Sequence, residues 1–290
     1  MSRNEIDLTG CRVLITGAAR GIGALTAKRL HERGARLALL GIEPDLLEQV
    51  AADCDATWHR CDVSDRGEVD AAVAAAVAEL GGLDVVICNA GIAAQLPLVG
   101  GDAAIFEKTM AVNTFGTYYV IRAAGEHVSH AGGYVLLTAS LAAAVHVPLL
   151  GAYSASKAAV EALGNTLRGE LRSSGARVGV AYYAELDTDM TTRGFATKAA
   201  QRSGLGGHGP LPVTPVELAI DAIEAGVRRR SRRVVAPRRV AAILPLRMPA
   251  QRLVDVVTRR RATAALEIAR TEEAPLTTPQ PEPASLAESK

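Results

Sequence analysis

Apolar runs of strand length alternate along the chain with longer segments in which apolar residues recur at helical spacing. The strand-like runs lie at residues 12–16, 35–40, 57–61, 83–91, 133–140, 177–183 and 232–237. The first helical segment follows the first strand and ends near residue 33, and the second begins near residue 44. The later helical segments span 65–80, about 102–130, 153–172 and about 214–227. Strands that are apolar almost throughout are typical of a parallel sheet with helices on both faces. With right-handed crossovers, this pattern predicts an α/β fold with a doubly wound parallel sheet of about seven strands.

A glycine-rich turn joins the first strand to the first helix, in the sequence VLITGAARGIG. Gly17, Gly21 and Gly23 let the backbone approach a pyrophosphate closely, and the free N–H groups at the helix N-terminus attract an anion. A tight strand–helix turn would also use such glycines, so the trio does not by itself establish a nucleotide site. Its place directly after the first strand favours a dinucleotide-binding site.

The glycine spacing and two later motifs resemble the short-chain dehydrogenase/reductase family. The glycines follow the family's TGxxxGxG pattern, CDVSD ends the third strand, and CNAG ends the fourth. The resemblance covers roughly residues 10–240 and implies a Rossmann-like fold that binds a nicotinamide dinucleotide. In the family, the aspartate of the second motif and its neighbour hold the adenine ring, and the third motif supports the sheet beside the cofactor. By resemblance, the residues expected to bind the cofactor are Gly17, Arg20, Gly21, Ile22, Gly23, Gly41, Asp62, Val63, Asn89, Ala90, Gly91, Tyr153, Lys157 and Thr188.

The segment GAYSASKAAV places Tyr153 and Lys157 four positions apart. Lysine is scarce, with five lysines against 27 arginines, so chance rarely produces a tyrosine–lysine pair at this spacing. On a helix the two side chains lie on one face, although a helix side that faces solvent would show the same spacing. Ser140, at the end of the fifth strand, and Asn113, in MAVNTFG, complete the Asn–Ser–Tyr–Lys catalytic set of the family in the family's order.

Physical chemistry and the resemblance together suggest a role for each member of this set. A free phenol has a pKa of about 10, and a nearby ammonium and an oxidised nicotinamide would lower the pKa of Tyr153 toward neutrality. Ser140 is expected to donate to the substrate oxygen, and Lys157 to supply charge and bind the nicotinamide ribose. Asn113 is expected to hold a water that links Lys157 to solvent. The predicted reaction is reversible hydride transfer between NAD(P)(H) and an alcohol or carbonyl carbon, without a metal.

The end of the second strand distinguishes NAD from NADP, because an acid there binds the ribose 2′-hydroxyl and repels a 2′-phosphate. Gly41 occupies that position and carries no charge. Arg20, in the glycine loop, can pair with a 2′-phosphate, which favours NADP(H) over NAD(H) as the cofactor. Glu43 is placed to turn toward the ribose and leaves NAD(H) as the alternative.

The loop after the sixth strand departs from the family pattern. The family usually has Pro-Gly there, whereas this chain has Tyr183 and Ala184, and Thr188 still occupies the position that contacts the nicotinamide carboxamide. The segment 190–213, glycine-containing and mixed in polarity, is expected to be a mobile lid over the substrate. The altered pair favours an alternative function, an NAD(P)-binding sensor or scaffold without turnover, and the intact catalytic set argues against it.

Charge is unevenly distributed, although the formal net charge is only +1. Residues 226–261 contain twelve arginines and one acid, Asp255. One explanation is that these arginines face solvent on a C-terminal helix that packs on the body or on another subunit. An amphipathic segment that contacts an anionic membrane surface is the alternative. No aromatic residue lies in the stretch, so nucleic-acid binding is not expected.

These observations divide the chain into a catalytic domain at 1–240, an arginine-rich helical extension at 241–270 and a disordered tail at 271–290. The N-terminus lacks the layout of a signal peptide and the four cysteines form no CxxC pair, so a reduced, cytoplasmic protein is predicted. By resemblance, the expected partners are an alcohol or carbonyl substrate and further copies of the chain, in a homodimer or homotetramer. The apolar flanks of the lid and the basic stretch favour a lipophilic or mid-sized substrate.

Overall fold

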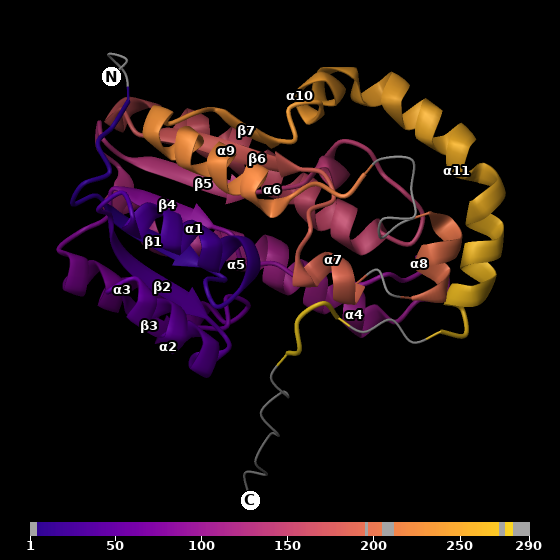
Figure 1. Ribbon diagram of the computed structural model, residues 1–290, viewed down its shortest axis with the longest axis horizontal. Coiled ribbons are helices and arrows are strands. Elements are labelled where there is room, and N and C mark those ends of the chain that lie inside the picture. Colours follow the sequence, from indigo (N-terminus) through magenta and orange to yellow (C-terminus); the bar gives the residue numbers. More distant parts are fainter. Residues whose placement is uncertain (1–4, 195–196, 205–211, 273–275, 281–290) are drawn as a thin grey trace, which may run out of the picture.

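A computed structural model describes residues 5–194, 197–204, 212–272 and 276–280. Its centre is a sheet of seven parallel strands in the order β3-β2-β1-β4-β5-β6-β7 (Figure 1). The strands are β1 (Arg12–Thr16), β2 (Arg36–Gly41), β3 (Thr57–Arg60), β4 (Val85–Cys88), β5 (Tyr134–Thr138), β6 (Arg177–Tyr183) and β7 (Arg233–Ala236). The strand order changes direction between β1 and β4, which is the switch point of a doubly wound sheet. The predicted Rossmann-like α/β fold is confirmed.

Helices cover both faces of the sheet. The helices of one face, which share one apolar cluster, are α1 (Gly21–His31), α2 (Pro44–Asp53) and α9 (Val216–Arg229). The helices of the other face, which share a second cluster, are α3 (Arg66–Leu80), α5 (Gly116–Ala124) and α6 (Gly151–Glu170). Because successive residues of a strand point to opposite faces, β1 gives Val13 and Ile15 to the first cluster and Leu14 to the second.

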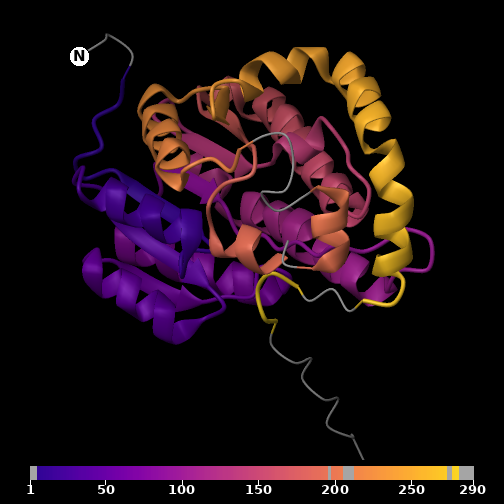
Figure 2. The same cartoon turned by 45° about the vertical axis from the view of Figure 1, so that its right-hand side comes forward.

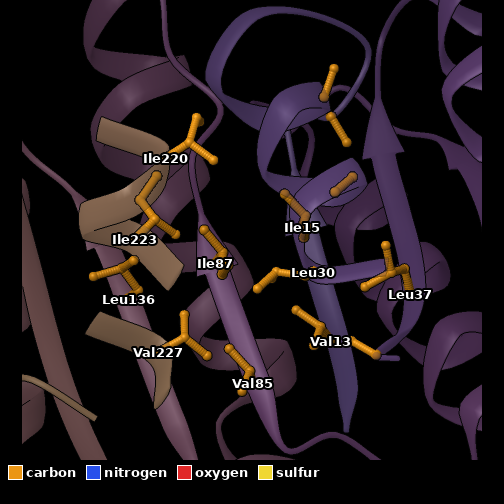
Figure 3. Close-up of a cluster of buried hydrophobic side chains, with 14 of the residues drawn as sticks. Val13, Ile15, Leu30, Leu37, Val85, Ile87, Leu136, Ile220, Ile223 and Val227 are labelled. Atoms are coloured by element: carbon orange, nitrogen blue, oxygen red, sulfur yellow. The ribbon is translucent and has the colours of Figure 1, made fainter. Parts of the chain in front are cut away.

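Figure 3 shows the first cluster, in which side chains of α9 lie beside side chains of β4 and β5. Ile220, Ile223 and Val227 of α9 are 4%, 1% and 0% exposed. They lie beside Ile87 of β4 and Leu136 of β5. Burying one side chain of this size contributes about 1.5–3 kcal/mol. The packing of α9 therefore helps to fix β4 and β5, the strands that lead into the candidate site.

The region predicted as one long helix at about 102–130 is divided in the structure. After α4 (Ala103–Met110) comes a single π-helical turn (Ala111–Phe115), which leads into α5 and then a 3₁₀ turn (Glu126–Val128). A π-helical turn widens the helix locally and often occurs at functional sites. This turn contains Asn113, which is fully buried.

The chain after β6 adds helices beyond the end of the sheet. The predicted lid, 190–213, includes most of α7 (Asp189–Gly194) and α8 (Lys198–Ser203), and its residues 195–196 and 205–211 lie outside the described part of the chain. The region predicted as a helical extension contains α10 (Val240–Ile243), a 3₁₀ turn (Leu244–Leu246) and α11 (Arg247–Ala269). Helix α11 curves around one end of the molecule and lies beside α8 in both views (Figures 1 and 2).

Residues 276–280 belong to the stretch that the composition predicts to be disordered, and the structure places them against the body. Thr277 is 2% exposed. Its N–H donates to the carbonyl oxygen of Ala93 at 3.0 Å, and its hydroxyl accepts from the N–H of Ala93 at 3.0 Å. Leu276 packs against the small apolar cluster that contains Leu96 and Ala152. One apolar side chain and two hydrogen bonds thus hold this segment, and residues 281–290 lie outside the described part.

Candidate active site

A cavity of about 710 Å³ lies at the carboxyl ends of the central strands, where doubly wound sheets bind their ligands. All but two of the predicted site residues line it. The lining residues are Gly17, Arg20, Gly21, Ile22, Gly41, Asp62, Val63, Asn89, Ala90, Gly91, Ser140, Tyr153, Lys157 and Thr188. The other two, Gly23 and Asn113, do not line the cavity, and each contacts a residue that does.

The loop after β1 fits a pyrophosphate in shape and in charge. Gly21 has a φ of +54°, and a Cβ atom there would meet nothing within 4 Å, so this residue borders open space. Arg20 begins α1 without a side-chain cap, which leaves the first N–H groups of the helix available to an anion. Gly17 has a φ of +64°, and a Cβ atom there would lie 2.7 Å from the Cα atom of Ala90. A Cβ atom on Gly23 would collide with the carbonyl oxygen of Gly17, so both glycines are required for close packing.

Asn89 fastens the end of β4 to this glycine loop. Its side-chain amide donates to the carbonyl oxygens of Thr16 and Gly17, both at 3.2 Å. The Thr16 hydroxyl accepts from the N–H groups of Asn89 and Ala90 at 3.0 and 3.1 Å. Thr16 is therefore a positioning residue that the sequence analysis missed, although it is the threonine of the TGxxxGxG pattern.

Asp62 lies at the end of the cavity where the resemblance places the adenine ring. Its carboxylate accepts from the N–H and the hydroxyl of Ser64 at 2.9 and 2.7 Å and from the ammonium of Lys108 at 3.2 Å. Burial opposes the charged form of Asp62, but these donors outweigh it, so the pKa of Asp62 lies below its ordinary value. The carboxylate is therefore ionised at neutral pH and held in place by its own loop and by α4.

The two charged residues that bear on cofactor choice form an ion pair with each other. Arg20 and Glu43 both line the cavity, and Nε of Arg20 donates to the carboxylate of Glu43 at 2.7 Å. A second nitrogen of Arg20 contacts the other carboxylate oxygen, so the pair is bidentate. The cation that would bind a 2′-phosphate and the acid that would bind a 2′-hydroxyl are thus bound to one another beside Gly41.

Ser140, Tyr153 and Lys157 come together in the wall of the cavity. Ser140 follows β5 in extended backbone, and its hydroxyl oxygen accepts from the N–H of Ala142 at 3.1 Å. Ser140 and Tyr153 both line the cavity, and hydrogen bonding to Ser140 acts to lower the pKa of the Tyr153 phenol. One turn further along α6, Nζ of Lys157 lies 5.7 Å from the centre of the Tyr153 ring and donates to the carbonyl oxygen of Thr138 at 2.8 Å.

Burial controls the ionisation of Tyr153 and Lys157. Burial raises the pKa of Tyr153, and the bond to Ser140 offsets only part of that rise. Burial also lowers the pKa of Lys157 to about 8. In the protein without its cofactor, burial therefore dominates, and the pKa of Tyr153 lies above its ordinary value. The positive charge of a bound, oxidised nicotinamide is the second contribution that is expected to lower the pKa of Tyr153.

Asn113 connects the π-helical turn to the loop after β4. Its Oδ1 atom accepts from the N–H of Ile92 at 2.8 Å, and its Nδ2 atom donates to the carbonyl oxygen of Ile92 and to the hydroxyl of Ser156, both at 2.9 Å. A Cβ atom on Gly91 would lie 3.2 Å from both Oδ1 of Asn113 and Nζ of Lys157, so these two side chains approach each other across Gly91. The side chain of Asn113 thus positions the cavity wall, and Ser156, inside the YxxxK motif, is a partner that the sequence analysis missed.

A protein-family model described as short chain dehydrogenase matches residues 12–199. The chain belongs to the short-chain dehydrogenase/reductase family. It is 36% identical over 180 residues to a D-threitol dehydrogenase of Mycolicibacterium smegmatis, a match that covers 60% of this chain and 69% of that one. It is 30% identical over 268 residues to a fatty acyl-CoA reductase of Mycobacterium tuberculosis, a match that covers 88% of this chain and 86% of that one.

The crystal structure of a short-chain dehydrogenase/reductase from Burkholderia phymatum in complex with NAD has the same fold. It aligns with a TM-score of 0.74 and 23% identity over 86% of this chain and 96% of that one. This chain is therefore an NAD(P)-dependent dehydrogenase/reductase that acts on alcohol or carbonyl groups. Family membership favours the enzyme over the non-catalytic sensor or scaffold that the sequence left as an alternative.

In this short-chain dehydrogenase the altered pair begins with a buried phenol, Tyr183, which is the last residue of β6. Tyr183 is 5% exposed and packs in the apolar cluster under α1 and α9. Its hydroxyl has no hydrogen-bond partner among the residues that the structure describes. Thr188 lines the cavity as expected, and Glu185 and Asp189 line it as well.

The end of this dehydrogenase's cavity that is expected to receive the substrate has mainly apolar walls. Those from the loop between Ser140 and α6 include Leu141, Val145, Val147 and Leu150. Those from α11 include Leu253, Val254 and Val257, and two threonines of the segment after it, Thr277 and Thr278, also line the cavity. None of the α11 residues was predicted as a site residue. Their helical spacing was visible in the sequence, but the surface that α11 faces depends on contacts between distant segments.

Proposed function

We propose that this enzyme transfers hydride reversibly between NADP(H) and a lipophilic or mid-sized alcohol or ketone. One observation carries the proposal: Ser140, Tyr153 and Lys157 meet in the wall of a single cavity that also contains the glycine loop and an apolar end. The nicotinamide supplies or accepts the hydride when bound. The side chains of this chain then have to orient the substrate oxygen and move one proton to or from it.

Tyr153 is the proposed acid–base residue, which gives its phenolic proton to the substrate oxygen in reduction and takes it back in oxidation. Because the Ser140 oxygen accepts from Ala142, its own O–H is available to donate to the Tyr153 oxygen or to the substrate oxygen. Lys157 is proposed to hold positive charge beside Tyr153 and to bind the nicotinamide ribose. Asn113 is proposed to hold a water that links Lys157 to solvent, from its place in the π-helical turn.

NADP(H) is proposed as the preferred cofactor. The uncharged Gly41 and the guanidinium of Arg20 in the cavity wall support this choice. Glu43 already pairs with that guanidinium, so a 2′-phosphate has to replace the Glu43 carboxylate as its partner. The preference for NADP(H) over NAD(H) therefore depends on the strength of the Arg20–Glu43 pair.

The apolar substrate end supports a lipophilic substrate, because apolar side chains leave polar groups of a ligand without hydrogen-bond partners. The relative named for a polyol, D-threitol, matches 60% of this chain. The relative named for a fatty acyl-CoA matches 88% of it, which includes residues beyond the family model. The more extensive likeness thus also supports a substrate with an extended apolar part.

Further copies of the chain are the proposed protein partners, in a homodimer or homotetramer built on α6 and its neighbour. Phe115, at the end of the π-helical turn, and Tyr118, in α5, are 52% and 46% exposed, which is high for aromatic side chains. Ala155 and Ala162 on α6 are exposed and small enough to permit close packing of helices.

Contact with an anionic membrane is also proposed, through Leu246 and Met248, which are 58% and 72% exposed, and the neighbouring Arg252. Among the described residues, none of the helices combines the length and the apolar character needed to cross a bilayer. A cytoplasmic location is proposed, and the four buried free cysteines support a reducing environment.

The proposed function is tested by following the absorbance of the reduced nicotinamide while NADP(H) or NAD(H) is offered with alcohols and ketones of increasing chain length. We expect kcat/KM to rise with chain length and to be higher with NADP(H). Turnover confined to short polyols would contradict the lipophilic substrate. Cofactor binding without turnover of any alcohol or ketone would contradict the proposed reaction.

A further inference from the structure

One face of α11 closes the substrate end of the cavity. Leu253, Val254, Val257 and Arg261 of this helix line the cavity, at the spacing expected for one side of a helix. Leu253 and Val257 are nevertheless 66% and 51% exposed. Apolar side chains that face a cavity and stay open to water are typical of a surface that an apolar ligand covers.

Helix α11 is attached to the body on both sides of this face. Near its start, Arg247 donates to both carboxylate oxygens of Glu161 on α6, at 2.8 and 3.2 Å. The side chain of Gln251 accepts from the N–H of His146 at 2.7 Å and donates to the carbonyl oxygen of His146 at 3.0 Å. Near its end, the fully buried Ala265 packs in a small apolar cluster. The helix is therefore held over the cavity as a fixed wall.

Arg261 is the cation that this wall presents to the cavity. Among the described residues it has no hydrogen bond and no ion pair. Most other charged groups of the cavity have a charged partner: Arg20 pairs with Glu43, and Asp62 pairs with a lysine. Lys157 donates to the backbone carbonyl of Thr138 and lies beside Tyr153, where the nicotinamide ribose is proposed to bind. The acidic residues Glu185 and Asp189, which also line the cavity, already have polar or ionic partners. Arg261 is thus a guanidinium without a counter-charge, one helical turn from Val257.

We infer that the substrate is amphipathic, with an apolar chain that covers Leu253, Val254 and Val257 and an anionic group that binds Arg261. A guanidinium binds carboxylates and phosphates through parallel hydrogen bonds, so either anion fits the site. This inference rests on the proposed function in one respect, namely that the same molecule brings its alcohol or carbonyl to Tyr153. It adds to that function the part of the substrate that lies farthest from the reacting carbon.

The helix provides matched controls for Arg261 and for Val257. Arg259 lies two residues from Arg261 but outside the cavity lining, and it is exposed. Val256 is adjacent to Val257, is 72% exposed and is also outside the lining. If the arginines and valines of α11 served only a surface such as a membrane, each control would matter as much as its partner.

The test measures binding of decanoate, decyl phosphate and decanol to the full-length protein by calorimetry, for the wild type and for Arg261→Ala, Arg259→Ala, Val257→Asp and Val256→Asp. We expect Arg261→Ala to weaken decanoate or decyl phosphate binding about tenfold, which corresponds to about 1.4 kcal/mol, and to leave decanol unchanged. The anion that binds more tightly to the wild type identifies the group. Val257→Asp should weaken all three ligands, and Arg259→Ala and Val256→Asp should weaken none.

Equal effects of Arg261→Ala and Arg259→Ala, or equal binding of both anions and decanol to the wild type, would overturn the inference. Turnover of short ketones is measured on the same samples, which separates the two proposals. Binding that depends on Arg261 without any turnover would leave the anion site in place and contradict the reaction. Turnover together with binding that does not depend on Arg261 would support the reaction and contradict the anion site.

Discussion

The ammonium nitrogen of Lys157 lies 5.7 Å from the centre of the Tyr153 ring, one helical turn along α6, where burial lowers the pKa of the lysine to about 8. Among the described residues its hydrogen-bond partner is a backbone carbonyl, that of Thr138, and not a carboxylate. The fold thus keeps an uncompensated cation in its interior, next to the phenol that is proposed to transfer the proton. Such a cation lowers stability wherever it is charged.

Lys157→Met should raise the free energy of unfolding at pH 7 by about 1–2 kcal/mol and abolish turnover. A fall in the pKa of Lys157 from 10.5 to about 8 corresponds to about 3 kcal/mol of stability lost in the wild type. In the variant the Thr138 carbonyl is left without its donor, which reduces the expected stabilisation by about 1–2 kcal/mol. Urea unfolding of the two proteins at pH 7 measures the difference. A variant less stable than the wild type would show that the lysine is compensated.

The stabilisation should also depend on pH in a defined direction. The folded lysine has a pKa of about 8 and the unfolded one 10.5, so between these values the unfolded state binds more protons. The buried lysine therefore lowers the free energy of unfolding of the wild type in full below pH 8, and this loss of stability disappears as the pH rises through 10.5. The advantage of Lys157→Met is therefore expected to shrink across this window. A difference that stays constant with pH would contradict the buried-cation account.

Glu43→Gln should raise the affinity for NADPH about tenfold and change that for NADH little. The carboxylate competes with a 2′-phosphate for Arg20, so its removal leaves the guanidinium to the cofactor. Arg20→Ala should have the opposite effect on NADPH alone. Fluorescence titration with both reduced cofactors checks both variants. Parallel changes in NADH and NADPH affinity would show that the pair does not contact the 2′-position.

Tyr183→Phe should raise the free energy of unfolding by about 1 kcal/mol. The hydroxyl is buried without a partner among the described residues, and removing an unpaired polar atom relieves its desolvation cost. The ring keeps its place in the apolar cluster. A urea midpoint above that of the wild type with an unchanged slope is the expected result. A lower midpoint would show that the hydroxyl makes a hydrogen bond.

Ending the chain before Leu276 should raise KM for long-chain substrates about tenfold, or about 1.4 kcal/mol, without a comparable change for short ones. Thr277 and Thr278 line the cavity, and Thr277 is bound to Ala93 on both its N–H and its hydroxyl. Ending the chain after Gln280 is the control and should leave both KM values unchanged. Equal KM values for the two truncated proteins would show that residues 276–280 take no part in binding substrate.

Much of the fold follows from the sequence because its signals are local. Gly17 and Gly21 mark a strand–helix turn by their spacing, and Tyr153 and Lys157 share a helix face because they are four positions apart. The rest depends on contacts between distant segments. Nothing near Asn113 indicates a π-helical turn, and nothing near Thr277 indicates its bonds to Ala93. The same limit applies to the pKa of Tyr153, since burial, which raises this pKa, is a property of the whole fold.

The central claim, that the Tyr153 phenol moves the proton that accompanies hydride transfer, is tested by a single-turnover experiment. The wild type and Tyr153→Phe are saturated with NADPH, mixed with a long-chain ketone, and followed by the absorbance of the reduced nicotinamide. We predict that the variant binds NADPH like the wild type and oxidises it at least about a hundredfold more slowly. Oxidation at the wild-type rate, with the phenol hydroxyl absent, would contradict the account.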